Sequence, residues 1–239
     1  MQPVRRYARN QKGTDFVIGD INGCYTTFEW LLEELGFSEE TDRVFVTGNL
    51  IGASEESYRV SEFIDLPWFH SILGTHDYRF VDYWHNHTID VSKINRQYQW
   101  TEKLHEWQLV NLIDKMAKLP VVIELVTEDG LFGFVHGDCS AKNWKEFVKE
   151  LREDNSDKER VGRRVTYQAV FGRDRYIQRN HRFVEAIKRI YCGHSNVKNV
   201  TCCGNVYYID AGVATGGRLT GINLSAKDTR YMAFVKAEA

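Results

Sequence analysis

The chain has 239 residues, of which 43% are hydrophobic and 27% are charged, and this composition excludes an intrinsically disordered protein. Lysine and arginine together number 31, aspartate and glutamate number 33, and the net charge is −2. Because this balance gives no overall positive field, we expect neither nucleic acid nor a membrane as the main partner. Aromatic residues make up 13% of the chain, enough to fill a core or to form a binding surface.

The cysteines and the apolar runs predict a cytoplasmic protein. Five cysteines are an odd number and none forms a CxxC pair, which argues against a disulfide framework or a zinc ribbon. Residues 1–15 lack the apolar core of a secretory signal, and no apolar run approaches the roughly 20 residues that cross a bilayer. We therefore expect the protein to work in a reducing cytoplasm.

The first third of the chain alternates strand-like and helix-like segments. Asp15–Ile18, Arg43–Thr47 and Trp68–Leu73 have the pattern of strands, and Thr26–Leu35 and Ser57–Ile64 have the spacing of helices. This order predicts a parallel sheet with right-handed crossovers. Each strand is followed by a glycine and polar residues, so three polar loops are expected to meet at one edge of the sheet, where such sheets bind ligands.

The middle of the chain is predicted to be more helical. The patterns favour helices at Tyr78–His85, His105–Lys118 and Trp144–Arg152, and a pair of strands at Val121–Val126 and Leu131–His136. Four short apolar runs in the last third suggest a second, mostly antiparallel sheet: Arg189–Cys192, Val206–Ile209, Leu219–Leu224 and Tyr231–Val235. We expect a single domain over residues 1–239, with an N-terminal arm at about residues 1–13.

The polar residues that follow the predicted strands are of the types that bind divalent metal ions. Carboxylate, amide and imidazole groups gathered at one sheet edge can hold one or two divalent ions, which can make hydroxide and bind a phosphoryl group. The same residue types are also good turn formers, and on residue types alone the turn interpretation is favoured. The residues concerned are Asp20, Asn22, Asn49, Thr75, His76, His136 and His194.

Six short motifs in order resemble those of the calcineurin-like metallophosphoesterases. VIGDINGCY is similar to their GDxHG motif, VTGNLIGAS falls where GDxxDRG belongs, and GTHDYR falls where GNHE belongs. FVHGDC and YCGHSNV are similar to the two later single-histidine motifs, and YIDAG to the strand that follows them. The resemblance covers residues 14–224 and is closest to serine/threonine protein phosphatases of the bacteriophage lambda type. It implies an α/β fold, a two-sheet β-sandwich of mixed sheets flanked by helices.

The resemblance implies that the first metal site is depleted. In the family, this ion is held by the Asp and His of the first motif and by a bridging Asp of the second. Asp20 is present, but Asn22 stands at the position of the His and Asn49 at that of the bridging Asp. A neutral amide can offer one oxygen but no charge to screen two ions from each other.

The second metal site is implied to be only partly depleted. Its ligands would be the bridging residue at Asn49, an Asn where this chain has Thr75, and the two later histidines, His136 and His194. Three of the six ligand positions therefore match the family pattern. We expect no cofactor or one weakly bound divalent ion, manganese or zinc, and we do not expect a dimetal centre.

The groups that would handle the substrate are also altered. His76 matches the general acid of the family, but the position of its orienting Asp is Gly52. An imidazole without a carboxylate partner is less well oriented for proton transfer. One phosphate-binding Arg position is Ala53, whereas a second is retained as Arg173. The resemblance therefore implies that one of two phosphate-binding guanidinium groups is missing.

These losses favour an impaired or inactive phosphatase, a pseudophosphatase that binds a protein partner or a phosphorylated ligand. If the protein comes from a phage, interference with a factor in the host cytoplasm would be a natural role. The alternative is a slow, metal-dependent phosphoesterase for protein or nucleotide substrates, with a mononuclear site of Asp20, His136 and His194 assisted by His76 and Arg173. A third hypothesis is a nucleotide or nucleic-acid binder using Arg163, Arg164, Arg173, Arg175 and Arg179.

The aromatic residues have two possible roles. A core role is favoured for most of them, and some rings beyond the third motif are candidates for interface anchors. The set consists of Trp68, Phe69, Tyr83, Trp84, Trp100 and Trp107.

Overall fold

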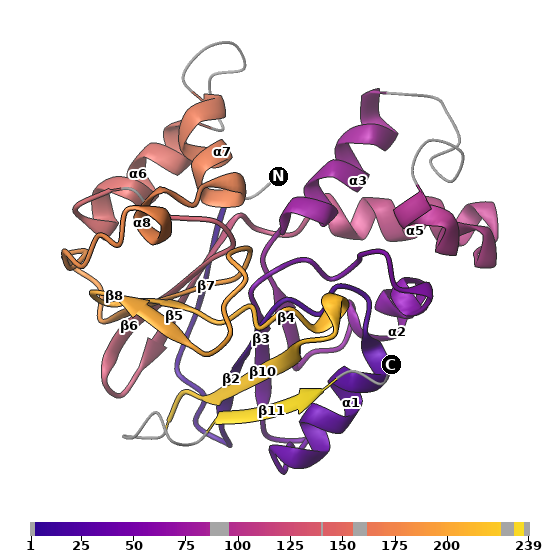
Figure 1. Ribbon diagram of the computed structural model, residues 1–239, viewed down its shortest axis with the longest axis horizontal. Coiled ribbons are helices and arrows are strands. Elements are labelled where there is room, and N and C mark those ends of the chain that lie inside the picture. The colour runs from indigo at the N-terminus through magenta and orange to yellow at the C-terminus, as the bar shows by residue number, and fades with distance from the viewer. Residues whose placement is uncertain (1–2, 87–95, 140, 155–161, 226–231, 237–239) are drawn as a thin grey trace.

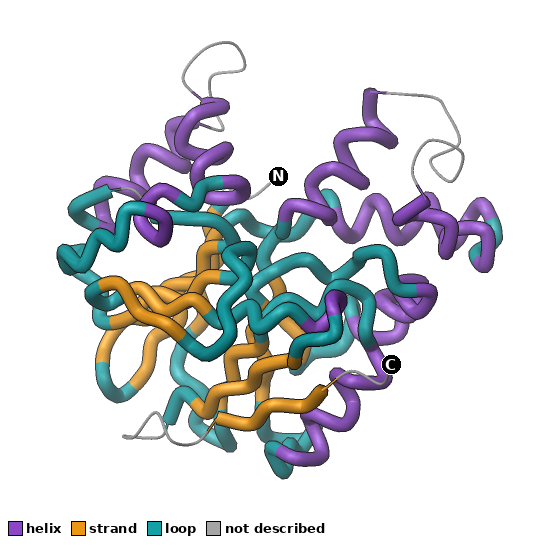
Figure 2. Tube along the Cα trace, viewed as in Figure 1, coloured by secondary structure: helices purple, strands orange, loops and turns teal. Residues whose placement is uncertain are grey.

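Two β-sheets are packed face to face and carry helices on their outer sides (Figures 1 and 2). The computed structural model describes residues 3–86, 96–139, 141–154, 162–225 and 232–236. Both sheets contain parallel and antiparallel pairs. The predicted fold class, an α/β sandwich of two mixed sheets flanked by helices, is confirmed.

The first sheet contains the three strands that were predicted from the start of the chain. β2 (Asp15–Ile18), β3 (Arg43–Val46) and β4 (Phe69–Ser71) are parallel neighbours, as expected. β10 (Arg218–Asn223) pairs with β2 in antiparallel orientation. The last strand pairs with β10, also antiparallel. In spatial order the sheet is β11 (Met232–Lys236), β10 (Arg218–Asn223), β2 (Asp15–Ile18), β3 (Arg43–Val46) and β4 (Phe69–Ser71).

The second sheet corrects the expectation of a separate antiparallel sheet in the last third. Two of the four apolar runs there, β7 (Arg189–Cys192) and β9 (Val206–Tyr208), pair in parallel with each other. β7 also pairs in parallel with β6 of the hairpin formed by β5 and β6, while the other two runs join the first sheet. Short apolar runs fix the existence of strands but not their partners. In spatial order this sheet is β1 (Val4–Tyr7), β5 (Val122–Thr127), β6 (Gly130–Val135), β7 (Arg189–Cys192), β9 (Val206–Tyr208) and β8 (Thr201–Cys203).

The N-terminal segment also differs from the expected arm. Val4–Tyr7 forms strand β1, which pairs in parallel with β5 in the register Val4 to Val122. Val4 is buried, whereas Arg6 on the same strand is exposed. A four-residue strand containing two arginines gives too little apolar pattern to be recognised in the sequence.

Alternation along the strands builds two layers of core. Val17 and Phe45 point into the space between the sheets, where Phe45 stacks on Phe134 of the facing sheet with ring centroids 5.3 Å apart. Phe16 and Ile18, one residue away from Val17 on either side, join the cluster beneath the helices instead. Because side chains of a strand alternate between faces, both faces of β2 are covered and all four of its residues are buried.

Four of the helices form two pairs on either side of the loops that join strands and helices, whereas α1 packs against β10 and β11 (Figure 2). α3 and α5 pack together on one side, and α6 and α7 pack together on the other with α8 nearby (Figure 1). α3 begins three residues before the predicted Tyr78, and α7 and α8 were not predicted. The helices are α1 (Tyr25–Glu34), α2 (Val60–Phe63), α3 (Thr75–Asn86), α5 (Glu106–Met116), α6 (Trp144–Asp154), α7 (Gly162–Phe171) and α8 (Asp174–Ile177), with 3₁₀ turns η1 (Glu55–Arg59), η2 (Arg96–Lys103) and η3 (Val213–Thr215).

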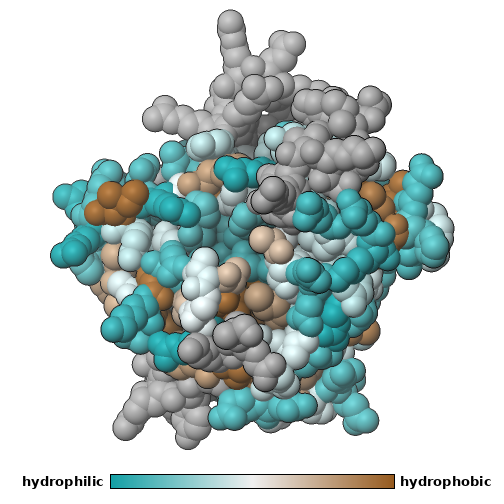
Figure 3. Space-filling view, turned by 45° about the vertical axis from the view of Figure 1, so that its right-hand side comes forward, coloured by the Kyte–Doolittle hydropathy of each residue, from teal (hydrophilic) through white to brown (hydrophobic). Residues whose placement is uncertain are grey.

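The core role of the aromatic set is confirmed for Trp68, Phe69 and Trp100, which are almost completely buried. Trp107 on α5 is 68% exposed and is free to contact a partner. On the face shown in Figure 3, hydrophobic residues lie in patches separated by hydrophilic ones. None of the described helices is long and apolar enough to cross a membrane.

Candidate functional site

The polar loops meet at one edge of the sandwich, as the strand order predicts. The loops after β2, β3 and β4 come from neighbouring parallel strands, and those after β6 and β7 come from the facing sheet. Cross-contacts between the two sets, described below, bring residues more than 100 positions apart within hydrogen-bonding distance. The residues brought together in this way are Asp20, Asn22, Asn49, Thr75, His76, His136 and His194.

The carboxylate of Asp20 is buried and accepts hydrogen bonds from the chain itself. Oδ1 accepts from Thr47 Oγ1 at 2.9 Å, and Oδ2 accepts from Asn49 Nδ2 and from the backbone N–H of His194, each at 3.0 Å. A Cβ atom on Gly193 would lie 1.9 Å from Oδ1, so only glycine fits beside it. Burial, with the charge of Asp210, raises the pKa of Asp20 well above its usual value.

The amide of Asn49 is used at both ends. While its nitrogen donates to Asp20, its Oδ1 accepts from the backbone N–H of His76 at 2.9 Å. The amide thus links the loop after β3 to the start of α3. At the position where the resemblance implies a charged bridging ligand, the chain has a neutral group held by its own hydrogen bonds.

Three of the site residues have left-handed backbone conformations. The φ angles are 51° at Asn22, 50° at Asn49 and 58° at His194, whereas only two other described non-glycine residues, Arg179 and Ala186, have positive φ. Asparagine tolerates this region better than most residues, and such strain persists where the surroundings fix it. These conformations set the directions in which the three side chains enter the site.

Two histidines lie side by side: His194 lines the cleft, and His136 is buried beneath it. The rings of His136 and His194 have centroids 5.1 Å apart. Nδ1 of His136 donates to the Thr47 carbonyl at 2.6 Å, and its Nε2 is buried without a hydrogen-bond partner among the described residues. Because the Thr75 hydroxyl donates its one hydrogen to the Val170 carbonyl, it accepts from His194 Nδ1, 3.2 Å away.

The three imidazoles of the site are neutral near pH 7. Burial lowers the pKa of His136 well below its usual value, and burial together with the charge of Arg79 lowers that of His76. Burial and the charge of Arg173 lower the pKa of His194 to about 4. Neutral imidazole has a free lone pair, so these rings can act as ligands or as proton acceptors.

The donors present do not fit a bridged pair of metal ions. Both oxygens of Asp20 are engaged by protein donors, and Asn49 brings no charge. Within the part of the chain that the structure describes, no three His, Cys, Asp or Glu side chains are grouped to hold a metal ion. Nε2 of His136 has no hydrogen-bond partner among the described residues, but His136 is fully buried and does not line the cleft. A single weakly bound ion, manganese or zinc, stays a prediction.

Packing around Gly52 leaves no room for a side chain. A Cβ atom there would lie 2.6 Å from the carbonyl oxygen of Asn22, and the backbone N–H and C=O of Gly52 both bond to the Ser57 hydroxyl at 3.1 Å. Nδ1 of His76 is buried and has no hydrogen-bond partner among the described residues. The next residue, Ala53, is exposed.

A cleft of about 600 Å³ opens over this edge of the sandwich. Asn22, Asn49 and His194 form part of its lining, whereas Asp20 and His136 lie beneath. Arg173 lines the cleft, as the family pattern implies, and so does Arg79 of α3. Arg79 was not among the predicted site residues, although it lies three residues after His76, the spacing that puts both on one helix face.

The arginines of the nucleic-acid hypothesis do not form one surface. Arg175 is buried, and its Nη1 donates to the carbonyls of Asn180 and Arg182 at 3.1 and 2.6 Å. The side chains of Arg163 and Arg164 lie outside the described residues. The hypothesis is therefore wrong in its use of Arg175, which serves the fold.

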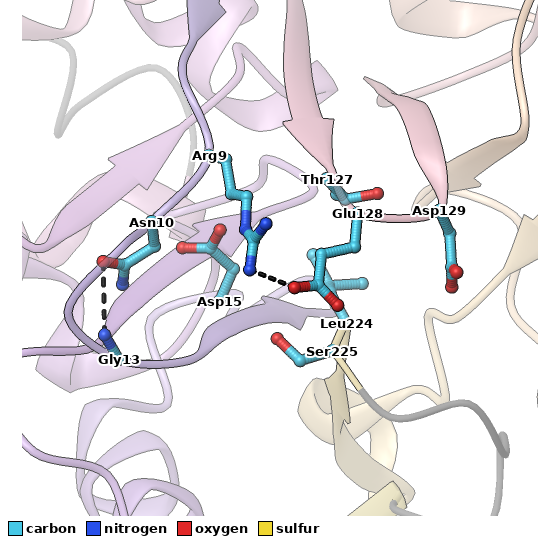
Figure 4. Close-up of a pocket in the computed structure, with 9 residues that line it drawn as sticks. All are labelled: Arg9, Asn10, Gly13, Asp15, Thr127, Glu128, Asp129, Leu224 and Ser225. Atoms are coloured by element: carbon cyan, nitrogen blue, oxygen red, sulfur yellow. Dashed lines mark hydrogen bonds and ion pairs between the residues drawn. The ribbon is translucent and has the colours of Figure 1, made fainter.

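A second, smaller pocket of about 150 Å³ lies near the start of β2, whereas the loops of the cleft follow the ends of β2, β3 and β4. Figure 4 shows the residues that line this pocket. Arg9 and Glu128 form an ion pair across it, and Asp15 is paired with Arg43. None of the predicted site residues lines this pocket. Because Arg9, Glu128 and Asp15 already have ion-pair partners, the cleft remains the candidate site.

Comparison with known proteins agrees with this geometry. A family model described as "Calcineurin-like phosphoesterase" matches residues 16–208. The chain belongs to this family. The match spans all the predicted site residues from Asp20 to His194 and confirms the resemblance read from the motifs.

The curated relatives and solved structures that resemble this chain include proteins named as phosphatases. The chain is 27% identical over 212 residues to "Serine/threonine-protein phosphatase 2" of Salmonella typhimurium, covering 86% of this chain and 90% of that protein. Over 64 residues, 26% of this chain and 23% of the relative, it is 36% identical to "Bis(5'-nucleosyl)-tetraphosphatase, symmetrical" of Erwinia tasmaniensis. A protein serine/threonine phosphatase from Saccharomyces cerevisiae superposes with a TM-score of 0.61 at 12% identity, covering 100% of this chain and 84% of that chain, which shows the shared fold.

Proposed function

We propose that this calcineurin-like phosphoesterase binds a phosphorylated ligand or protein partner in the cleft and hydrolyses it slowly or not at all. The observation that carries the proposal is the neutral amide at the centre of the site. Asn49 is bonded to Asp20 on one side and to the backbone of His76 on the other. A carboxylate at this point would attract divalent ions, whereas an amide already engaged at both ends does so weakly.

The surroundings of His76 support the same proposal. The position expected to carry its orienting carboxylate is Gly52, where a Cβ atom would collide with the backbone of Asn22. Arg173 remains in the cleft to hold an anion, so binding is retained in the proposal while proton transfer is weakened.

A second candidate function is a slow, metal-dependent phosphoesterase, and the free Nε2 of His136 favours it. With His194 and Asp20 nearby, His136 would hold one manganese or zinc ion, which polarises a phosphoryl oxygen and lowers the pKa of bound water. Arg173 would orient the phosphate. His76 is a neutral imidazole, so it would give a proton to the leaving group only after accepting one, for example from the attacking water.

Metal analysis and turnover of p-nitrophenyl phosphate in added manganese separate the two candidates. The first predicts less than one ion per chain and the same slow turnover in the wild-type protein and in the His136→Ala variant. Stoichiometric metal, with turnover that is lost in His136→Ala, would instead establish the metal-dependent enzyme.

Restoring the family residues tests the cause of the proposed impairment. The first variant carries Asn22→His, Asn49→Asp, Ala53→Arg and Thr75→Asn, and the second adds Gly52→Asp. We expect the first to gain manganese binding and turnover, and the second to be less stable because the Asn22 backbone must move. If the first variant is folded but binds no metal, these positions do not explain the loss.

A protein partner is the other part of the proposal, and it would be expected in the cytoplasm of the host if a phage encodes the chain. The exposed ring of Trp107 is the described aromatic from the predicted set best placed to contact one. Capture from host lysate with the wild-type protein and with Trp107→Ala tests this role. A partner retained equally by both proteins would exclude Trp107 from the contact.

A further inference from the structure

Two arginine side chains line the cleft without a carboxylate in ion-pair contact among the described residues. Arg173 donates from Nη2 to the His194 carbonyl at 2.9 Å, and the guanidinium of Arg79 lies 5.7 Å from the centroid of the Phe171 ring. Both side chains are exposed at the cleft, so each retains donors that face solvent. A guanidinium has five N–H donors, and neither of these contacts uses more than a part of them.

The two arginines come from different elements that meet beside the cleft. Arg79 belongs to α3, and Arg173 lies in the connection between α7 and α8. Phe171, two residues before Arg173, packs edge-on against Tyr78, so the helices that carry the arginines are held together at this point. Both arginines line the same cleft, together with His194.

The other titratable groups that face the cleft leave a positive balance. His76 and His194 are the two imidazoles in the lining. Asp210 is the carboxylate in the lining, and it accepts from the backbone N–H of Gly212 at 3.0 Å. Two guanidinium groups against one carboxylate favour an anionic ligand.

We propose that Arg79 and Arg173 form a two-armed clamp for a phosphoryl dianion, and that this clamp binds without a metal ion. Arg79 supplies from α3 the guanidinium that Ala53 does not supply from the loop after β3. Two arginines can hold a phosphate by charge-assisted, bidentate hydrogen bonds that need no bound cation. This inference rests on the proposed function, because it names the groups that bind the phosphorylated ligand.

Titration calorimetry with inorganic phosphate in EDTA at constant ionic strength tests the clamp. We expect saturable binding by the wild-type protein and a loss of at least about tenfold in affinity in both Arg79→Gln and Arg173→Gln. Arg152→Gln on α6, an exposed arginine outside the cleft, is the matched control and should bind like the wild-type protein. Because Arg79 is exposed and makes one ring contact, thermal unfolding should show that its variant is folded.

The outcomes separate this inference from the proposed function. If the wild-type protein binds neither phosphate nor phosphoserine, with or without EDTA, the clamp and the phosphorylated-ligand part of the proposed function are both overturned. If it binds and Arg79→Gln binds equally well, or if EDTA abolishes binding, the clamp is overturned while the proposed function stands. Phosphoserine should bind at least as tightly as phosphate, since the cleft has room for the attached group. A site that accepts the free ion and excludes the ester would overturn the link to a phosphorylated ligand.

Discussion

The two sides of the cleft satisfy their polar groups in different ways. On the side of β2 and β3, Asp20 and Asn49 are bonded to each other and to backbone groups. On the side of β6 and β7, His136 keeps a buried nitrogen without a partner among the described residues, and Arg173 has donors facing the cleft. On the first side the polar groups of Asp20 and Asn49 are used in hydrogen bonds within the protein, whereas on the second side Arg173 has N–H donors that can bind a ligand.

The largest effect is expected from Asn49→Asp, which would remove this difference. The variant places a second buried carboxylate against Asp20 and loses the amide donor between them. We expect the free energy of unfolding to fall by about 3 to 5 kcal/mol at neutral pH in EDTA. Manganese should recover part of this loss. Urea unfolding measures both effects.

The control for this variant is Asn196→Asp, which adds the same charge at an exposed position in the same cleft. Its cost should stay within about 0.5 kcal/mol. Equal losses in the two variants would mean that the contact between Asn49 and Asp20 does not hold the first side closed.

On the other side, neighbouring arginines should give opposite results. Arg175 is buried beside Asp138 and bonded to backbone carbonyls, so Arg175→Gln should lower the free energy of unfolding by about 3 to 4 kcal/mol. Arg173→Gln should change it by less than about 0.5 kcal/mol, because Arg173 is exposed. Denaturant unfolding of the two variants, Arg175→Gln and Arg173→Gln, measures these two changes in stability. A large loss in Arg173→Gln would make that residue structural and remove it from the binding side.

A smaller effect is expected in the pH dependence of stability on the first side. Burial raises the pKa of Asp77, which accepts from the backbone N–H groups of Ile51 and Gly74, to about 6. The folded state then keeps a proton that the unfolded state releases, so stability falls as the pH rises from about 4 to 6, by about 3 kcal/mol in total. Asp77→Asn should remove the part of this slope that Asp77 contributes, so the fall in stability measured by unfolding from pH 4 to 7 should be shallower than in the wild-type protein.

The exposed Asp114→Asn serves as the control for Asp77→Asn and should leave the slope unchanged. If Asp77→Asn keeps the wild-type slope, other groups are responsible for it. Burial also raises the pKa values of Asp20 and Asp210, which makes them the next groups to test.

The first part of the fold could be predicted because its strands and helices alternate in a regular order. Asp15–Ile18 is bounded by polar residues and followed by Gly19 and Asp20, and the structure has a strand with those bounds. The short runs near Arg189 and Val206 also became strands, but their parallel partners depend on contacts that no local pattern encodes. The strand at Val4 could not be recognised, because its four residues include two arginines and give too little apolar pattern.

The motifs predicted which residues form the site, but not the hydrogen bonds between them. They brought Asp20, Asn49 and His194 into one expected group, and the structure places them in contact. They did not indicate that the Asn49 amide would bond at both ends, because that depends on distances across loops. Arg79 was missed because the predicted helix began at Tyr78, which hid the helical spacing between Arg79 and His76.

Strand β1 protects the second sheet at its outer edge. Without it, β5 would present the unpaired backbone of Val122, Ile123 and Leu125, a surface to which strands of other molecules can add. β1 itself is short and carries Arg5 and Arg6, and charges of this kind discourage further pairing. Shortening the chain at its start would therefore act first on self-association, while the loops of the cleft lie outside this edge of the sheet.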